Sequence, residues 1–384
     1  MVPVENCTGC SACRFYCPQD AIAMVEDGEG FPYPRIDTQK CNSCGLCLRD
    51  CPVQTAPTIK PVGVPTLYAG WTNDLDLLRQ STSGGVFSEI ARGVIEDGGV
   101  VFGAAYDETL TVRHMAVETW DNLRALRGSK YVQSDVGDTY RQAERHLTSG
   151  RRVLFSGTPC QIAGLHAAIG TDHKDLLTCD LICHGVPSLK VFRMALDSIE
   201  KRKKSKVVDF FFREKSCGWL YPTVQIAFAD GTLLNENNTD NHFNLGFLKN
   251  IYLRPSCYQC PIKTYASMAD ITLGDFWQLV NFQPSLINRR GTSAVLVNTE
   301  SGRQAIQRCS GRLSLTECSF AFIEKESNLR KSVKPSPERE AFFADLDGFS
   351  FEDLTRKYIR PRNGLARRLA RLRRVLRTWN QEWK

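Results

Sequence analysis

The sequence lacks several features that would assign it at once to a common class of protein. No apolar run approaches the ~20 residues of a membrane-spanning helix, so no such helix is expected. No segment resembling a signal peptide precedes Cys7, the first cysteine. A complete Gly-x-Gly-x-x-Gly is also missing, which argues against a separate nicotinamide site of the Rossmann type. These absences direct attention to the residues that are abundant.

Length and charge set the limits of the fold. With 384 residues, of which 42% are hydrophobic, the chain is long enough for two or three domains with buried cores. The net charge of +7 is unevenly spread, because residues 356–384 carry 11 Lys and Arg against one Glu. That segment has a net charge of +10, which leaves −3 for the rest of the chain. The body is therefore mildly acidic, and the C-terminal end is strongly basic.

Cysteine is abundant, and half of the sixteen cysteines lie in two copies of one pattern. Cys-x2-Cys-x2-Cys-x3-Cys-Pro begins at Cys7 and again at Cys41, and it matches the bacterial ferredoxin run for a 4Fe–4S cluster. Three closely spaced thiolates line a tight loop, and the fourth is directed to the other cluster. We therefore assign one cluster to Cys7, Cys10, Cys13 and Cys51, and a second to Cys41, Cys44, Cys47 and Cys17.

Zinc knuckles and a disulfide framework are the alternatives for these eight cysteines. Zinc sites tend to have two Cys-x2-Cys pairs separated by a longer gap, whereas this chain repeats the whole cluster pattern. Thiolate-ligated clusters need a reducing environment, so we expect a cytoplasmic protein.

The order of patterns predicts an α+β ferredoxin-like N-terminal domain, an α/β flavin-binding domain and a basic helical C-terminal tail. A hairpin is expected over 21–36, with its turn at Asp27-Gly28, and a proline-rich linker over 56–66. Alternating strands and helices then indicate the α/β domain. We expect strands within 100–106, 151–157, 176–185, 269–277 and 292–299, and helices within 86–98 and 161–169. The predicted units are 1–55, 67–150, 151–333 and the tail 334–384.

Four of the remaining cysteines form a second candidate set. Cys160 lies at a strand-to-helix turn, Cys183 at the end of a strand, and Cys257 and Cys260 form a Cys-x2-Cys. Strand ends are where α/β folds gather functional groups, so these four thiols could hold a third 4Fe–4S cluster. They could equally be buried, inert thiols.

The motifs GTPCQ, CDLICHGVPS, RPSCYQCPIKTYAS, DITLGDFW and GTSAVLVNT together resemble the beta-subunit family of coenzyme F420 hydrogenases and dehydrogenases. The resemblance covers roughly residues 67–325. It implies FAD and one 4Fe–4S cluster, with cluster ligands at Cys160, Cys183, Cys257 and Cys260. Met268 and Gln278 depart from the family's pattern, which puts the substrate in doubt.

Two glycine-containing segments are candidates for the FAD site. Ser83, Gly84 and Gly85 precede an expected helix, whose free N–H groups attract phosphate, although a plain helix cap has the same pattern. In the second segment, Lys130 could hold a phosphate or polarise the flavin and Tyr131 could stack on it. Both segments match those that the family uses around its flavin. His184 could donate a proton there, or it could orient the neighbouring Cys183. Lys130 and His184 are our catalytic candidates.

These patterns together predict an iron–sulfur flavoprotein oxidoreductase. It would couple two-electron chemistry on an organic hydride substrate, such as coenzyme F420, to a ferredoxin-like or other redox partner. The alternative is a non-catalytic electron-transfer subunit or adaptor for a partner enzyme, for example in polysaccharide biosynthesis. No nucleic-acid partner is expected.

The tail has the pattern of a basic amphipathic helix. Leucines recur at helical spacing from Leu365 to Leu376, arginines cover the remaining surface, and Trp379 and Trp383 follow. This pattern fits an interfacial helix at the inner membrane face. It fits a solvated helix, or docking on an acidic partner, nearly as well.

Overall fold

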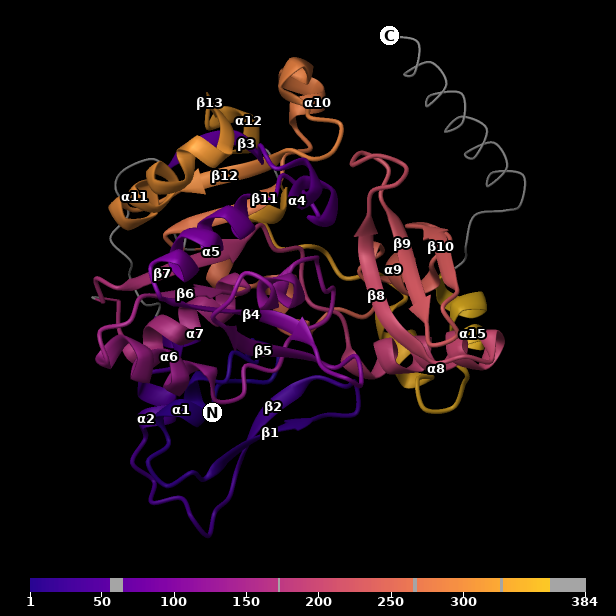
Figure 1. Cartoon of the computed structure of the whole chain (residues 1–384). Coiled ribbons are helices and arrows are strands. Elements are labelled where there is room, and N and C mark those ends of the chain that lie inside the picture. Colours follow the sequence, from indigo (N-terminus) through magenta and orange to yellow (C-terminus); the bar gives the residue numbers. More distant parts are fainter. Residues whose placement is uncertain (56–64, 172, 265–267, 325–326, 360–384) are drawn as a thin grey trace.

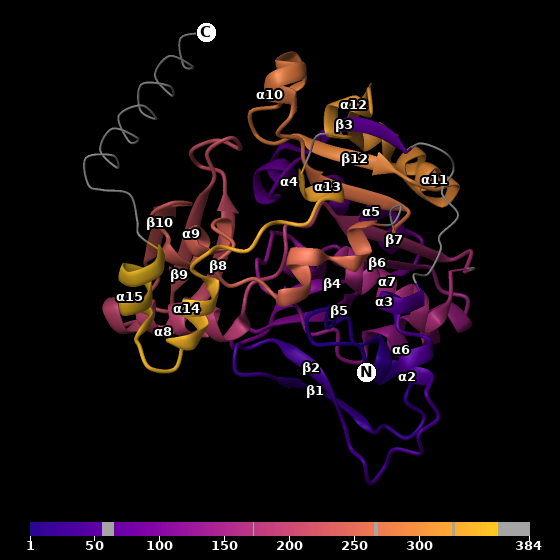
Figure 2. The same ribbon diagram turned by 180° about the vertical axis from the view of Figure 1, so that it is seen from behind.

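The computed structural model describes residues 1–55, 65–171, 173–264, 268–324 and 327–359. It is a mixed α/β protein in which an N-terminal unit, residues 1–55, lies against a larger body (Figures 1 and 2). The tail, residues 360–384, and most of the expected linker, residues 56–64, lie outside the described residues. None of the helices in the described ranges has the length and apolar character needed to cross a membrane.

The N-terminal unit contains the predicted hairpin between its two cysteine runs. Strands β1 and β2 pair in antiparallel register from Ile22↔Ile36 to Glu26↔Pro32. The Asp27 carboxylate accepts hydrogen bonds from the amides of Glu29 and Phe31, which fixes the turn. The elements of the unit are α1 (Ala12–Tyr16), β1 (Ile22–Glu26), β2 (Pro32–Ile36), α2 (Leu46–Arg49) and α3 (Pro52–Thr55).

An eight-stranded mixed sheet forms the centre of the body. Its spatial order is β13-β3-β12-β11-β7-β6-β4-β5, and the four strands β4, β6, β7 and β11 run parallel. The carboxyl ends of these four strands therefore meet at one edge of the sheet. The strands are β3 (Thr66–Thr72), β4 (Val100–Tyr106), β5 (Val112–Val117), β6 (Val153–Ser156), β7 (Leu176–Leu181), β11 (Ile271–Asp275), β12 (Ser293–Val297) and β13 (Leu313–Cys318).

Helices cover both faces of this sheet, as buried parallel strands require. One face packs against α5 and α11 in a core that includes Ile90, Leu154 and Ile306. The other packs against α6 and α7 around Phe102 and Phe155. The helices of this part are α4 (Leu75–Gln80), α5 (Val86–Glu96), α6 (Thr139–Thr148), α7 (Pro159–Ile169), α10 (Leu279–Phe282), α11 (Glu300–Cys309), α12 (Ala321–Glu324) and α13 (Ser327–Arg330).

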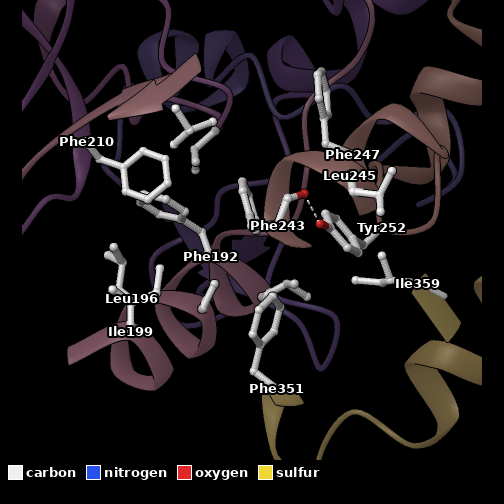
Figure 3. Packing of buried hydrophobic residues seen from close by; sticks show 14 of the residues in the cluster. Phe192, Leu196, Ile199, Phe210, Phe243, Leu245, Phe247, Tyr252, Phe351 and Ile359 are labelled. Atoms are coloured by element: carbon white, nitrogen blue, oxygen red, sulfur yellow. Dashed lines mark hydrogen bonds between the residues drawn. The ribbon is translucent and has the colours of Figure 1, made fainter. Parts of the chain in front are cut away.

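A second, three-stranded sheet stands beside the first and has its own core (Figure 1). Figure 3 shows this core, in which Phe192, Phe210 and Phe243 pack together with Tyr252 and Phe351. This sheet was not among the predicted elements. Its elements are α8 (Leu189–Lys203), β8 (Val207–Glu214), β9 (Thr223–Phe228), β10 (Leu233–Asn237), α9 (His242–Leu248), α14 (Arg339–Ala344) and α15 (Phe351–Leu354).

The predicted strands and helices of the body are confirmed, whereas the predicted division into units stays a prediction. Strands from both expected parts, 67–150 and 151–333, share the central sheet, because β3 pairs with β12 on one side and β13 on the other. The hairpin of the N-terminal unit rests on α8, where the Arg193 guanidinium bonds the Glu26 carboxylate at 2.9 and 3.0 Å.

Candidate functional site

Four cysteines of the first predicted cluster line one pocket. Cys7, Cys10, Cys13 and Cys51 surround it, and Cys47 contributes to the wall. Burial and, to a smaller extent, the nearby thiols of Cys7 and Cys51 raise the pKa of the Cys13 thiol to about 12. The Thr8 hydroxyl, which lines the same pocket, is buried without a hydrogen-bond partner among the described residues. The donor set and this unpartnered hydroxyl fit a thiolate-ligated group.

The second predicted set lies closer to solvent. Cys44 is exposed, whereas Cys17, Cys41 and Cys47 are partly buried. The Cys17 sulfur accepts a hydrogen bond from the Ala21 amide at 3.2 Å. Of these four thiols, the pocket of the first set includes Cys47. The assignment of this set therefore stays a prediction from the spacing.

The third set gathers at the edge where the parallel strands end. Cys160 lies in the first turn of α7, directly after β6, and Cys183 follows β7 by two residues. Cys257 lies in the 3-10 helix Pro255–Gln259, and Cys260 follows it. Burial raises the pKa of Cys183 well above its ordinary value, and the thiols of Cys257, Cys160 and Cys260 add to the rise. The fold thus brings all four predicted thiols together.

The arrangement of these thiols differs from that of a site for one ion. Within the described ranges, no three His, Cys, Asp or Glu side chains meet closely enough to hold a metal ion. The ligands of a four-iron cluster stand around a cube and are further apart than those of a single ion. Burial is also the first cause of the raised pKa of Cys160, to about 11, and of Cys257, to about 12.

A chain of hydrogen bonds holds the start of α7, and with it Cys160, in place. The Gln161 amide donates to the Ser134 hydroxyl at 2.9 Å, and this hydroxyl is 2.8 Å from His114 Nδ1. The other ring nitrogen, Nε2, is 2.9 Å from the Ser156 carbonyl, so it carries the hydrogen and Nδ1 accepts. Burial lowers the pKa of His114 to about 4. The neutral ring is thus fixed in one tautomer.

The first and third cysteine sets are neighbours in space. A Cβ atom added to Gly164 of α7 would stand 3.0 Å from the Cys10 Cβ. The Tyr140 hydroxyl lies 2.9 Å from the Cys10 carbonyl and 2.8 Å from the Gln161 carbonyl, and it can donate to one of them at a time. Burial raises the pKa of Cys10 far above its ordinary value, and the thiols of Cys13 and Cys160 contribute.

The two candidate flavin segments also lie side by side. The Ser129 amide donates to the Thr82 hydroxyl at 3.0 Å. Gly84 is tightly enclosed, because its amide donates to Ser293 Oγ at 2.9 Å and an added Cβ would be 2.2 Å from the Gly70 carbonyl oxygen. The close approach at Gly84 is therefore to β3 and β12 of the protein itself. The amide of Gly84 is already used.

Gly85 and Ser83 have structural contacts of their own. Gly85 adopts a φ of +79° at the start of α5, where no side chain caps the helix. An added Cβ there would be 2.8 Å from Thr72 Cγ2. The Ser83 hydroxyl donates to the Thr292 carbonyl at 3.1 Å, and the Ser83 carbonyl accepts from Lys215 Nζ at 3.0 Å.

Tyr131 and His184 contact one aromatic ring, whereas Lys130 bonds to the backbone. Tyr131 stacks on Phe247 with 4.8 Å between ring centroids, and His184 meets the same Phe247 ring edge-on at 5.0 Å. His184 Nε2 is 2.6 Å from the Asn250 side-chain oxygen. Lys130 Nζ donates to the carbonyls of residues 125 and 127, and burial lowers the pKa of Lys130 to about 8. His184 and Cys183 are adjacent, so these ring contacts start at the third cysteine set.

An arginine, an aspartate and two tryptophans, none of them predicted as site residues, lie beside these segments. Arg213 forms a nearly buried ion pair with Asp275 at 2.9 Å, and the Trp219 indole donates to the same carboxylate at 2.6 Å. The rings of Trp219 and Trp277 stack at 4.6 Å. Arg213 Nε and Nη2 are buried without a partner among the described residues. In the sequence, only the position of Asp275 at the end of an expected strand could have indicated a site here.

The residues around the two candidate segments fit FAD in part. The uncapped start of α5 and the unused N–H groups of Arg213 favour an anionic group at this edge. The Lys215 ammonium is held nearby by the carbonyls of Leu78, Ser83 and Arg290. Burial lowers the pKa of Lys215 to about 8. The residues present are compatible with a flavin dinucleotide, although the amide of Gly84 is not free to take part.

The other four cysteines have separate positions. Cys179 and Cys309 are buried, Cys318 is partly buried and Cys217 is exposed. Burial raises the pKa of Cys309 to about 11. Met268, at which the sequence departs from the family's pattern, is buried in the core beneath α7.

Two family models match the regions just described. Residues 150–319 match the model for the C-terminal part of the coenzyme F420 hydrogenase/dehydrogenase beta subunit. Residues 6–55 match the model for a 4Fe-4S dicluster domain. The resemblance indicated by the motifs is thus confirmed over these two stretches.

Two curated proteins and one solved structure are similar to parts of the chain. One subunit of the Na(+)-translocating ferredoxin:NAD(+) oxidoreductase complex of Acetobacterium woodii is 46% identical over 47 residues, which are 12% of this chain and 13% of that protein. Pyruvate synthase subunit PorD of Methanocaldococcus jannaschii is 32% identical over 56 residues, 15% of this chain and 60% of that protein. The chain thus spans less than two thirds of either relative.

The solved structure is of the F420-reducing [NiFe] hydrogenase complex from Methanosarcina barkeri. One of its chains aligns with a TM-score of 0.47 and 17% identity, over 77% of this chain and 92% of that one. The dicluster match identifies residues 6–55 as an iron–sulfur domain of the 4Fe-4S dicluster type.

Proposed function

We propose that this iron–sulfur protein is an oxidoreductase that couples two-electron chemistry at FAD to one-electron transfer. One observation carries the proposal. The first cysteine set lies against the third at Cys10 and α7, and His184, which follows Cys183, contacts Phe247 and through it the flavin candidate Tyr131. An unbroken series of candidate redox sites is what electron transfer between a flavin and a surface partner requires.

The residues that would hold each group follow from their positions. The two ferredoxin-type sets and the set of Cys160, Cys183, Cys257 and Cys260 would each hold a 4Fe–4S cluster. Segment 81–85, Lys130, Tyr131 and Arg213 would hold FAD. FAD held there would supply two-electron hydride chemistry, and the clusters would supply one-electron transfer.

The protein's own groups orient the substrate and supply protons. Lys130 holds its ammonium against two backbone carbonyls, and with a pKa near 8 it can give up a proton close to neutral pH. His184 is held by Asn250 and Phe247 next to the third cysteine set, where it can orient Cys183 or carry a proton.

The substrate and the partner follow from the same resemblance. Coenzyme F420 is the first organic hydride donor to test, and a ferredoxin-like protein is the first one-electron partner. Both curated relatives are, by name, subunits of larger redox assemblies. The rival proposal is therefore a non-catalytic relay subunit that exchanges only single electrons with a partner enzyme.

Iron content tests the three clusters. Anaerobically purified protein should contain about twelve irons per chain, and Cys257→Ser should lower this number to about eight. Cys309→Ser, which replaces a buried thiol outside the three sets, should leave it unchanged. An iron content near eight that Cys257→Ser does not alter would remove the third cluster.

Flavin binding tests the enzymatic proposal. We expect the protein to bind FAD on reconstitution, and Lys130→Met to weaken binding while iron stays at the wild-type level. Lys206→Met removes an exposed lysine and serves as the control. Reduced coenzyme F420 should then drive reduction of an artificial acceptor. A protein with intact clusters that never binds flavin, and exchanges only single electrons, would be the relay.

A further inference from the structure

One fully buried charge has no charged partner in the part of the chain that the structure describes. Arg254 is 0% exposed and lies three residues before Cys257. Its backbone amide bonds the Val186 carbonyl, and its guanidinium lies over the Tyr33 ring of the N-terminal unit at 4.2 Å. Buried arginines are normally paired with a carboxylate, because an isolated buried charge is costly.

The polar contacts of Arg254 are all with uncharged acceptors. Its Nε donates to the Cys7 carbonyl at 2.7 Å, and one Nη donates to the Gln133 side-chain oxygen at 3.0 Å. The other Nη donates to the Pro32 carbonyl at 2.9 Å and lies 3.9 Å from the Cys7 sulfur. These contacts satisfy the N–H groups but leave the positive charge uncompensated.

Arg254 contacts residues of two cysteine sets. Its guanidinium lies against the sulfur of Cys7, from the first set. Its backbone carbonyl accepts a hydrogen bond from the amide of Cys257, from the third set, at 2.9 Å. Arg254 therefore lies between the first and third cysteine sets, at the contact between the N-terminal unit and the body.

We propose that Arg254 is the shared counter-charge of these two cluster sites and raises the reduction potential at both. The inference rests on the proposed function. A cluster held by four thiolates is anionic, and its reduction adds one electron and one further negative charge, with no bond formed or broken. A fixed positive charge in a medium of low dielectric constant favours the reduced form. Arg254 thus acts through its charge on the reduction potential and is not a catalytic residue.

The test is a potentiometric titration of the holoprotein, in which electron paramagnetic resonance detects the reduced clusters. Arg254→Met should load with wild-type iron, and at least one cluster should become tenfold harder to reduce, a shift of about 59 mV to lower potential for one electron. Arg254→Lys, which keeps the charge but loses the planar set of donors, should restore most of the potential. Arg193→Gln removes an exposed arginine that is paired with Glu26 at the same contact, and it should shift nothing.

Each remaining outcome is also decisive. Unchanged potentials in iron-loaded Arg254→Met would overturn the inference. If Arg254→Met fails to load iron, loading of Arg254→Lys supports the need for the charge. Equal failure of both variants would mean that the side chain acts only through its hydrogen bonds. A wild-type protein without clusters would instead refute the proposed function itself.

Discussion

Gly9 shows how closely the first cysteine loop packs against the body. Its φ is +68°, and an added Cβ would stand 2.8 Å from an Arg254 nitrogen and 2.9 Å from the Gln133 side-chain nitrogen. Gly45, in the second cysteine run, has a similar φ of +76°, but nothing lies within 4 Å of its added Cβ. The two glycines thus share a left-handed backbone, which glycine adopts without strain, and differ in packing.

This difference predicts unequal effects of alanine. Gly45→Ala should cost about 1–2 kcal/mol of stability from the left-handed backbone alone. Gly9→Ala should cost about 1–3 kcal/mol more, because the guanidinium must move. Thermal unfolding of the two anaerobic variants makes the comparison. Equal losses of stability would show that the loop yields to the extra methyl group.

His114 predicts a pH dependence of stability. Its pKa in the folded protein is about 4, below the ordinary value of 6.5. As the pH falls below 6.5, the unfolded chain takes up a proton and the folded chain does not, so stability decreases until the pH reaches about 4. Between pH 6.5 and 5.5 the loss should be about 1 kcal/mol.

The His114→Gln variant isolates this effect. It should be less stable at pH 7, because the bond to the Ser156 carbonyl is altered, but its stability should vary less between pH 6.5 and 5.5. Unfolding curves of the anaerobic proteins at three pH values in this range suffice. Parallel pH profiles would exclude His114 as the source.

Sequence and structure agree best where chemistry imposes a spacing. The pattern around Cys7 and Cys41 predicted a dicluster domain, which the family match confirms. Arg254 could not be predicted as a special residue, because one arginine in a loop has no periodicity. Its role depends on Pro32 and Cys7, which are more than 200 positions away in the sequence.

Among the elements, α7 has the clearest link to function. Its first turn carries Cys160, and the Gln161 side chain both accepts from the Thr158 amide at 3.0 Å and donates to Ser134 Oγ. Gln161→Leu should lose this cap, at a cost of about 1 kcal/mol, and release Cys160 from its fixed position.

Iron content again provides the measurement for α7. Gln161→Leu should bind about four irons fewer than the wild type, as expected when one cubane is lost. Gln142→Leu, on the neighbouring helix α6, is the control and should retain all of its iron. Full iron content in Gln161→Leu would show that the remaining ligands hold Cys160 in place.

The predicted elements differ in how far local sequence determines them. The runs around Val100–Tyr106 and Val86–Glu96 have strong periodicity, and both appear as predicted. The three-stranded sheet was not predicted, although β8 and β9 are rich in β-branched and aromatic residues; only β10, with the sequence Leu233–Asn237, lacks a strand pattern. Likewise, no local signal shows that β3 lies between β12 and β13.

At the scale of the whole molecule, the basic tail remains a sequence-based prediction. A chain that ends at Ile359 keeps the described body and lacks the arginine-rich segment. Full-length protein should co-sediment with anionic liposomes at low salt, because each arginine near the surface contributes about 1 kcal/mol. High salt should abolish this binding. If the shortened chain sediments equally, the tail serves packing or a protein partner.

The position of β3 between β12 and the edge strand β13 has a consequence for how the protein is made. β3 ends at Thr72, but its partner β13 begins at Leu313, about 240 residues later. At ~5–20 residues per second, a ribosome needs tens of seconds to supply this strand. Until then the sheet lacks its edge strand. Cys160 and Cys183 therefore leave the ribosome before the body has finished folding. Delivery of iron to the third set is therefore expected to follow synthesis, whereas the dicluster unit can be loaded on the nascent chain.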